Sequence, residues 1–441
     1  MESTTLSVVL ILAIAVAVFL GYKTKINTGL FCIVFAYLIG CFWLGLKPKQ
    51  LIGFWPTKIM FVILAVSLFY NVAAANGTLE KISQSLLYSC RRFPGMLPYA
   101  LFFVAVVLSI MGAAYFTVLA FLAPIALLIC EESHMDKLTG AVAINCGALA
   151  GGDFPTAALG VIFRGLMDTS YEAAPDLAAI DSFGSMLTLF SLAVIFSLIL
   201  ITIFRFGFKS NRNIGKGVTF QKPEPYDKKQ KQTLMLIVIM MVLILTFPLL
   251  KLLLPDAAIV SKIAGKVDVG LIAIVFAVIA LLMKLASQKE IIAKVPWNTI
   301  IMIAGAGMLI EVAVKAGTID MLSRWIGSNI PVFLIPVVFS LVAAVMSFFS
   351  STTGVVAPAL FPLIPMLAVT SGLNPAVLFT CTVLGAQSSA ISPFSSGGSL
   401  VLGGCTNEEQ RNELFNRLLL VAVPISVGVC AVYNLIVSMI L

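Results

Sequence analysis

Charged residues are scarce in this chain. Asp, Glu, Lys and Arg make up 11% of its 441 residues, whereas hydrophobic residues make up 60%. A soluble domain of this length needs more polar surface, so that class is excluded. Apolar runs of about 20 residues, long enough to cross a bilayer as helices, recur along the sequence. The composition therefore predicts an all-α polytopic membrane protein, which we place in the cell inner (plasma) membrane.

Several kinds of site are also missing. The chain has one histidine and eight cysteines, and no two cysteines have CxxC spacing. A metal centre or a disulfide framework is therefore not expected. No GxxxxGK[ST] loop is present, which argues against direct ATP coupling. We expect no cofactor apart from a bound sodium ion. The excess of Lys and Arg lies in loops between apolar runs, where it orients a membrane protein and does not indicate nucleic acid.

The sequence contains an internal repeat. Pro56, Gly77 and Thr78 meet identical residues 240 positions later, and Gly147 and Pro155 meet identical residues 238 positions later. Matched glycine and proline matter most here, because these residues set backbone geometry. Repeats that each bring irregular segments into an apolar span are typical of transporters.

We expect the first copy at residues 1–206 and the second at 233–441, joined by a basic linker at 207–232. The excess of lysine and arginine predicts that this linker is cytoplasmic. An odd number of spans in each copy would invert the second copy relative to the first. About ten spans are expected, near residues 5–21, 28–46, 57–76, 138–165, 183–206, 233–254, 268–286, 297–316, 375–403 and 415–440.

Two further apolar stretches, residues 97–130 and 331–370, are too long for one span. Each is interrupted at its centre by small or hydroxylated residues, at 111–117 and at 350–354. We interpret both stretches as re-entrant helical hairpins.

The spans at 138–165 and 375–403 are expected to be broken helices. Glycine, serine and proline gather inside them, at residues 145–156 and 387–398. Backbone that leaves a helix at membrane depth must line a cavity or be buried in protein, so the breaks and the hairpin centres should meet at one central site. Half-helix N-termini there suit an anion, and the opposite ends suit a cation.

Asp153 is the most unusual residue of this region. It is an acid within an apolar span, and its repeat partner is Ile391. A carboxylate there is costly and usually functional. Two interpretations stay open: Asp153 coordinates a coupling cation or exchanges a proton, or it only fixes the loop through hydrogen bonds. The residues expected at the coupling-ion site are Asp153, Asn145, Gly151, Ser388 and Ser389.

Hydroxyl groups at the second hairpin centre and the second break indicate a substrate site, although they would also cap helices. An aromatic residue at the first hairpin centre is a weaker candidate, because packing explains it equally well. The residues expected to bind substrate are Ser351, Thr352, Thr353, Gly354, Thr156, Ser395, Ser396, Gly397 and Tyr115.

The motifs SSTTG at 350–354 and SPFSSGGSLVLGG at 392–404 give the chain a resemblance to a known family. It resembles the ion transporter superfamily, specifically the divalent anion/sodium symporters and the malonate-type dicarboxylate carriers. The first hairpin centre, GAAYFT, and the first break, GGDFPT, depart from the family pattern. The resemblance implies substrate carboxylates between two hairpin tips, sodium beside each tip, an elevator-like movement and usually a homodimer.

We therefore expect a secondary active transporter, not an enzyme, that carries a small organic dianion such as malonate or succinate with Na⁺ or H⁺. One alternative is a cation/proton antiporter of the same superfamily, with Asp153 as the exchanged site. An intramembrane aspartyl protease would need a second facing acid, and no second mid-span aspartate is evident. A passive channel or structural role is the remaining alternative.

Overall fold

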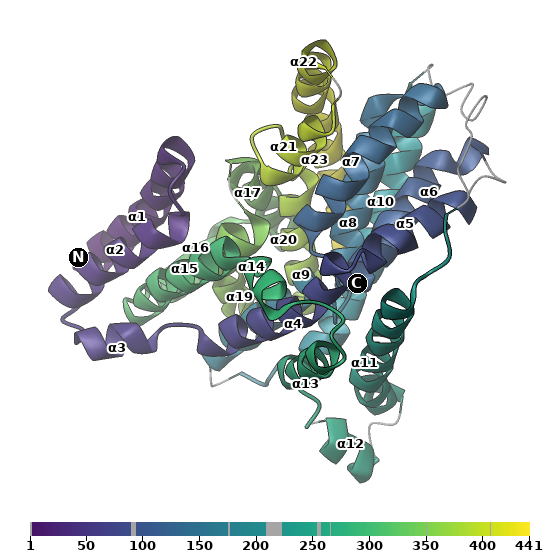
Figure 1. Ribbon diagram of the computed structural model, residues 1–441. Helices are drawn as coiled ribbons and strands as arrows, with labels where there is room; N and C mark the ends of the chain where they lie inside the picture. Colours follow the sequence, from purple (N-terminus) through teal and green to yellow (C-terminus); the bar gives the residue numbers. More distant parts are fainter. Residues whose placement is uncertain are drawn as a thin grey trace.

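The computed structural model describes residues 2–89, 94–174, 177–208, 223–253, 257–264, 266–349, 351–405 and 407–441. These residues are almost entirely helical, and none of them lies in a β-strand (Figure 1). Large apolar side chains stay exposed on the outside of the bundle, including Phe42, Leu282 and Met439. Such a surface is expected where lipid surrounds the helices. The all-α, multi-pass membrane fold is therefore confirmed.

The helices of the first half lie on both sides of a compact centre (Figure 1). In chain order they are α1 (Glu2–Thr24), α2 (Thr28–Phe42), α3 (Pro48–Gly53), α4 (Thr57–Ala75), α5 (Thr78–Ser89), α6 (Leu97–Ile110), α7 (Tyr115–Glu132), α8 (Lys137–Gly152), α9 (Ala158–Glu172) and α10 (Ser182–Gly207). Most of the predicted linker, residues 209–222, lies outside the described residues.

The second half contains the same kinds of helix, with more interruptions. In chain order they are α11 (Lys228–Leu253), α12 (Ala258–Ala264), α13 (Val269–Leu282), α14 (Gln288–Ala293), α15 (Trp297–Lys315), α16 (Thr318–Asn329), α17 (Ile335–Phe349), the π-helix η5 (Thr352–Val356), α18 (Ala357–Leu360), α19 (Ile364–Ser371), α20 (Pro375–Ser388), α21 (Ser396–Gly403), α22 (Glu408–Arg417) and α23 (Val423–Ile440).

Seven helices of the described residues are long and apolar enough to cross a membrane, or eight if the bent pair α16 and α17 counts as one span. Five shorter apolar helices accompany them, among them α6, α13 and α20. The expected number of about ten spans stays a prediction.

Helices recur at the separations found in the sequence. α5 and α16 each contain 12 residues, and they begin 240 positions apart. The packing recurs as well: α2 packs against α15 and α13 against α4, while α6 packs against α8 and α17 against α20. The helices of the two halves are thus interleaved in space. The inverted orientation of the halves stays a prediction.

Two helical hairpins form where the long apolar stretches lie. In the first, α6 and α7 are joined by a tight turn in which Gly112 has φ +95°, a left-handed conformation that glycine adopts without strain. In the second, the returning arm is divided into η5, α18, a 3₁₀ turn and α19. Pro358, Pro362 and Pro365 lie in this arm, and each removes a backbone donor from a continuous helix.

The two expected breaks are present but shorter than the sequence pattern suggested. The first covers residues 153–157, between α8 and α9, and the second covers 389–395, between α20 and α21. Asn145 and Gly151 are helical, so the predicted start of the first break at residue 145 is wrong. The reason is packing. A side chain on Gly151 would collide with the backbone of α6 at Val106, so this glycine permits close helix contact and does not end the helix.

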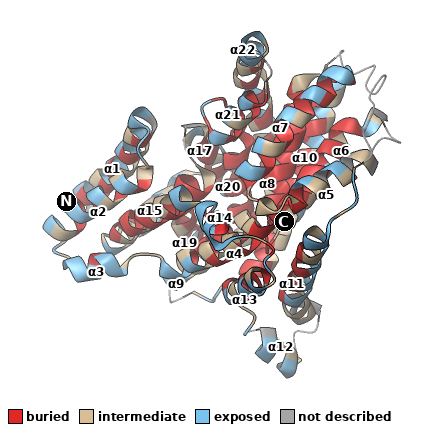
Figure 2. Ribbon diagram, viewed as in Figure 1, coloured by how far each residue is buried: buried red, intermediate tan, exposed pale blue. Residues whose placement is uncertain are grey.

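The breaks lie in the most buried part of the molecule. Figure 2 shows α8 and α20 as the reddest helices, and every residue of α8 from Leu138 to Gly152 is buried. A helix that is buried on all sides has protein around its ends, where broken backbone finds hydrogen-bond partners without meeting lipid.

Close helix contact at Gly385 gives a first prediction. A methyl group there would overlap the backbone of α17 at Ser340, so Gly385→Ala should destabilise the protein by about 1–3 kcal/mol. Thermal unfolding in detergent measures the effect. The control is Gly428→Ala in α23, where a methyl group meets no described atom within 4 Å. That variant should melt at or above the wild-type temperature, because alanine favours helix. Equal melting of both variants would contradict the packing argument.

Candidate functional site

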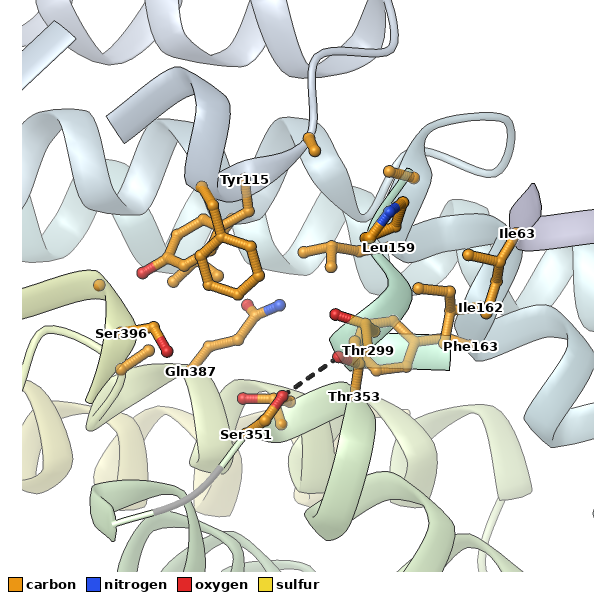
Figure 3. A pocket seen from close by; sticks show the side chains of 18 of the residues that line it. Ile63, Tyr115, Leu159, Ile162, Phe163, Thr299, Ser351, Thr353, Gln387 and Ser396 are labelled. Carbon is orange, nitrogen blue, oxygen red and sulfur yellow. Dashed lines mark hydrogen bonds between the residues drawn. The ribbon is translucent and has the colours of Figure 1, made fainter. Parts of the chain in front are cut away.

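A central cavity lies where the hairpin turns and the broken helices meet (Figure 3). Its free volume of about 100 Å³ exceeds the space that one water molecule needs, so a small ligand fits. Most of the residues expected to bind substrate line it, namely Tyr115, Ser351, Thr352, Thr353, Ser395, Ser396 and Gly397.

The starts of four helices line this cavity. They are the first residues of α7, α9, η5 and α21, namely Tyr115, Ala158, Thr352 and Ser396. The first N–H groups of a helix have no partner within the helix, and the helix dipole is positive at that end. No Lys, Arg, His, Asp or Glu of the described residues lines the cavity. A positive potential in the cavity would therefore come from backbone amides, an arrangement that suits an anion.

Serine hydroxyls cap two of these helix starts. Ser351 Oγ accepts from Gly354 N at 3.3 Å, and Ser395 Oγ accepts from Gly398 N at 3.5 Å. Ser351 Oγ and Thr353 Oγ1 lie 3.3 Å apart, the hydrogen bond drawn in Figure 3. The hydroxyls thus cap helix ends and also line the cavity. That they bind substrate stays a prediction.

Tyr115 of the first half packs closely against Gly397 of the second half. Its hydroxyl donates to Asn145 Oδ1 of α8 at 2.7 Å. The same hydroxyl lies directly over Gly397, where any side chain would collide with it. Gly397 is therefore needed for the close approach of the first hairpin to the start of α21.

Asp153 lies behind the cavity wall. It is fully buried, follows the last residue of α8, and is not among the described residues that line the cavity. Gln387 of α20 donates through Nε2 to both carboxylate oxygens of Asp153, each at 2.9 Å. Gln387 itself does line the cavity. This pair joins the two broken helices.

Gln387 is a site residue that was not predicted. Its signal in the sequence is an amide within an apolar span, next to Ser388 and Ser389, which were predicted as site residues. Thr299, the third residue of α15, and Ser347, near the end of α17, also line the cavity and were not predicted.

Of the other residues expected at the coupling-ion site, Gly151 accepts from the backbone N–H of Asp153, while the described side-chain hydrogen bonds of Asn145, Ser388 and Ser389 go to other residues. Ser388 and Ser389 donate to backbone carbonyls, of Gly385 at 2.6 Å and of Ala344 at 2.8 Å. Asn145 and Ser388 line a second, smaller cavity behind the first, which Gln387 also borders. Gly151 packs against α6.

Two residues expected to bind substrate lie outside the described lining of the cavity. Gly354 packs under Met302 of α15. Thr156 lies in the first break, and its hydroxyl is buried without a hydrogen-bond partner among the described residues.

Comparisons with known proteins agree with the fold and the sequence motifs. Residues 179–439 match the family described as the sodium:sulfate symporter transmembrane region, and residues 4–152 match the dicarboxylate carrier protein MatC N-terminus. A comparison with curated proteins gave no match.

Two solved structures share the fold. The YdaH transporter of Alcanivorax borkumensis is 16% identical with a TM-score of 0.63, over 88% of this chain and 86% of that one. MtrF of Neisseria gonorrhoeae, described with a class of antimetabolite efflux pumps, is 13% identical with a TM-score of 0.57, over 89% of this chain and 83% of that one.

Proposed function

This chain belongs to the sodium:sulfate symporter family, and from that premise we propose that it carries a small organic dianion, a dicarboxylate such as malonate or succinate, across the membrane together with Na⁺ or H⁺. The single observation that supports this proposal most is the meeting of four helix starts at one cavity without a charged side chain among the described residues that line it. Such a site attracts negative charge through backbone amides alone.

The same observation argues against the cation/proton antiporter. An antiporter carries only cations, whereas the helix starts around the central cavity favour an anion. We propose that Asp153 acts in coupling, through a cation or a proton, and that the two hairpins move with the broken helices in an elevator-type step. We also propose a homodimer in the inner membrane, with no enzymatic activity.

Uptake into proteoliposomes tests this function. Labelled malonate and succinate are offered under an inward sodium gradient, an inward proton gradient, or neither. Accumulation that depends on one gradient supports the proposal and identifies the coupling ion. Cation movement without dicarboxylate uptake would support the antiporter, and no transport of either kind would overturn both.

Substitution of Thr353 by alanine should weaken substrate binding. Thr353 is buried and lines the cavity at the start of η5, so its hydroxyl would donate to a carboxylate. Loss of a hydrogen bond to a charged group costs about 1.5–3 kcal/mol, which is roughly a tenfold to hundredfold rise in the apparent KM. The control is Thr370→Ala in α19, whose hydroxyl bonds only its own helix, to Met366 O and Leu367 O. Equal KM values in both variants would show that Thr353 does not bind substrate.

A further inference from the structure

The two halves contribute very different walls to the central cavity. Of the twelve lining residues from the first half, only Ser67 and Tyr115 are polar. Of the eleven from the second half, eight are polar: Thr299, Ser347, Ser351, Thr352, Thr353, Gln387, Ser395 and Ser396. In Figure 3 the labelled Ile162 and Phe163 lie on one side of the cavity and Ser396 and Gln387 on the other, while Thr299 and Thr353 lie beside Phe163.

The difference appears at matched positions of the repeat. At the separation of 238, the polar Ser395 and Ser396 correspond to Ala157 and Ala158, and Gly397 corresponds to Leu159. At Gly397 the second half makes room for the hydroxyl of Tyr115, while at the equivalent position the first half carries a leucine side chain.

At the hairpin turns and in the broken helices, too, a polar residue of the second half corresponds to an apolar residue of the first half. Thr352 corresponds to Ala114 at the same separation, and both line the cavity. Gln387 corresponds to Leu149, which also lines the cavity. A site with hydroxyl side chains at both ends would hold a symmetric dianion by both ends; here the first half offers the helix starts of α7 and α9 and the hydroxyl of Tyr115, but no cluster of serine and threonine hydroxyls.

We propose that the cavity holds its ligand in one orientation, with the carboxylates against the serine and threonine cluster of the second half and a hydrocarbon group against the apolar wall of the first half. The inference rests on the proposed function and narrows its substrate class. The preferred ligand is a dicarboxylate with both carboxylates close together and an alkyl substituent, that is, a 2-alkylmalonate.

The apolar wall consists of aliphatic and aromatic side chains from α4, α8 and α9, including Ile63, Leu149, Leu159, Ile162 and Phe163. A methylene group moved from water to such a surface strengthens binding by roughly fourfold, which is the fold-change that burial of one CH₂ predicts. A dicarboxylate of the same carbon number whose carboxylates are far apart gains nothing, because its second carboxylate would face this wall.

Titration calorimetry on the purified full chain in detergent tests the orientation. The probes are malonate, methylmalonate, ethylmalonate, succinate and glutarate. We expect Kd to fall by roughly fourfold for each methylene from malonate to ethylmalonate, and to rise from succinate to glutarate. Equal or weaker binding of the alkylmalonates would overturn the inference.

A pair of leucine variants locates the effect. Leu159→Ser should reduce the gain from methyl and ethyl groups, measured within this variant as the ratio of the malonate Kd to the ethylmalonate Kd. Leu400→Ser, in α21 outside the central cavity, should keep the gain. If the alkyl groups strengthen binding to Leu159→Ser as much as to the wild type, the apolar wall does not contact them.

Uptake of labelled malonate separates this inference from the proposed function. Gradient-driven malonate uptake without an alkyl preference leaves the function standing and overturns the inference. Binding of no probe, together with no uptake, overturns both.

Discussion

An Asp153→Leu variant should lose at least about nine-tenths of its transport activity and should unfold at a lower temperature. Both hydrogen bonds of Gln387 Nε2 end on the carboxylate of Asp153, so leucine leaves a buried amide without its acceptors. An unsatisfied buried donor costs about 1–3 kcal/mol. The side chain of Gln387, which lines the cavity, would no longer be fixed there. Proteoliposome uptake and thermal unfolding measure the two effects.

Asp153→Asn separates the charge of Asp153 from its hydrogen bonding. Asparagine keeps one oxygen that accepts from Gln387, but it carries no charge and replaces the second acceptor by an NH2 donor. If Asp153 serves in coupling, this variant should be destabilised less than Asp153→Leu and should bind substrate, and it should lose gradient-driven accumulation. Normal accumulation in Asp153→Asn would show that Asp153 has no role in coupling and serves only to position Gln387. Normal uptake and normal unfolding in Asp153→Leu would contradict any role of the pair.

A Gly397→Ala variant should bind substrate roughly fivefold to hundredfold more weakly, because overpacking of a tight contact costs about 1–3 kcal/mol. The added methyl group would collide with the hydroxyl of Tyr115 and lie 2.5 Å from Ala390 O. Tyr115 must then leave Asn145, and the start of α21 must move away from the first hairpin. Calorimetry with malonate measures the affinity.

The matched control for Gly397 lies on the same helix. A methyl group on Gly403 meets no described atom within 4 Å, so Gly403→Ala should bind as the wild type does. If both variants bind equally well, the contact between Tyr115 and Gly397 has no part in forming the site.

Local backbone chemistry explains which parts of the site could be predicted from the sequence. Glycine and proline interrupt apolar runs at the hairpin turns and breaks, and this signal needs no knowledge of neighbouring helices. Gly151 misled the prediction because a glycine also serves close helix packing, and only the position of α6 distinguishes the two uses. Gln387 was missed for a similar reason. Its partner Asp153 lies 234 positions away in the sequence, and no local pattern connects them.

The difference between the two walls of the cavity follows from residues at matched positions of the repeat. Leu149 and Leu159 occupy the positions of Gln387 and Gly397 in the other half. Their significance depends on lining the same cavity, which is a property of the three-dimensional arrangement.

The interleaved packing of the halves has a consequence for biosynthesis. α2 packs against α15, and α4 packs against α13, so helices made early find their main partners only in the second half. Asn71 of α4 donates to Ile291 O, 220 residues further along the chain, and Gly29 of α2 leaves room only for the backbone of α15. A ribosome adds roughly 5–20 residues each second. The early helices therefore wait in the bilayer for many seconds with their small-residue faces uncovered, during which an insertase or chaperone has time to shield them.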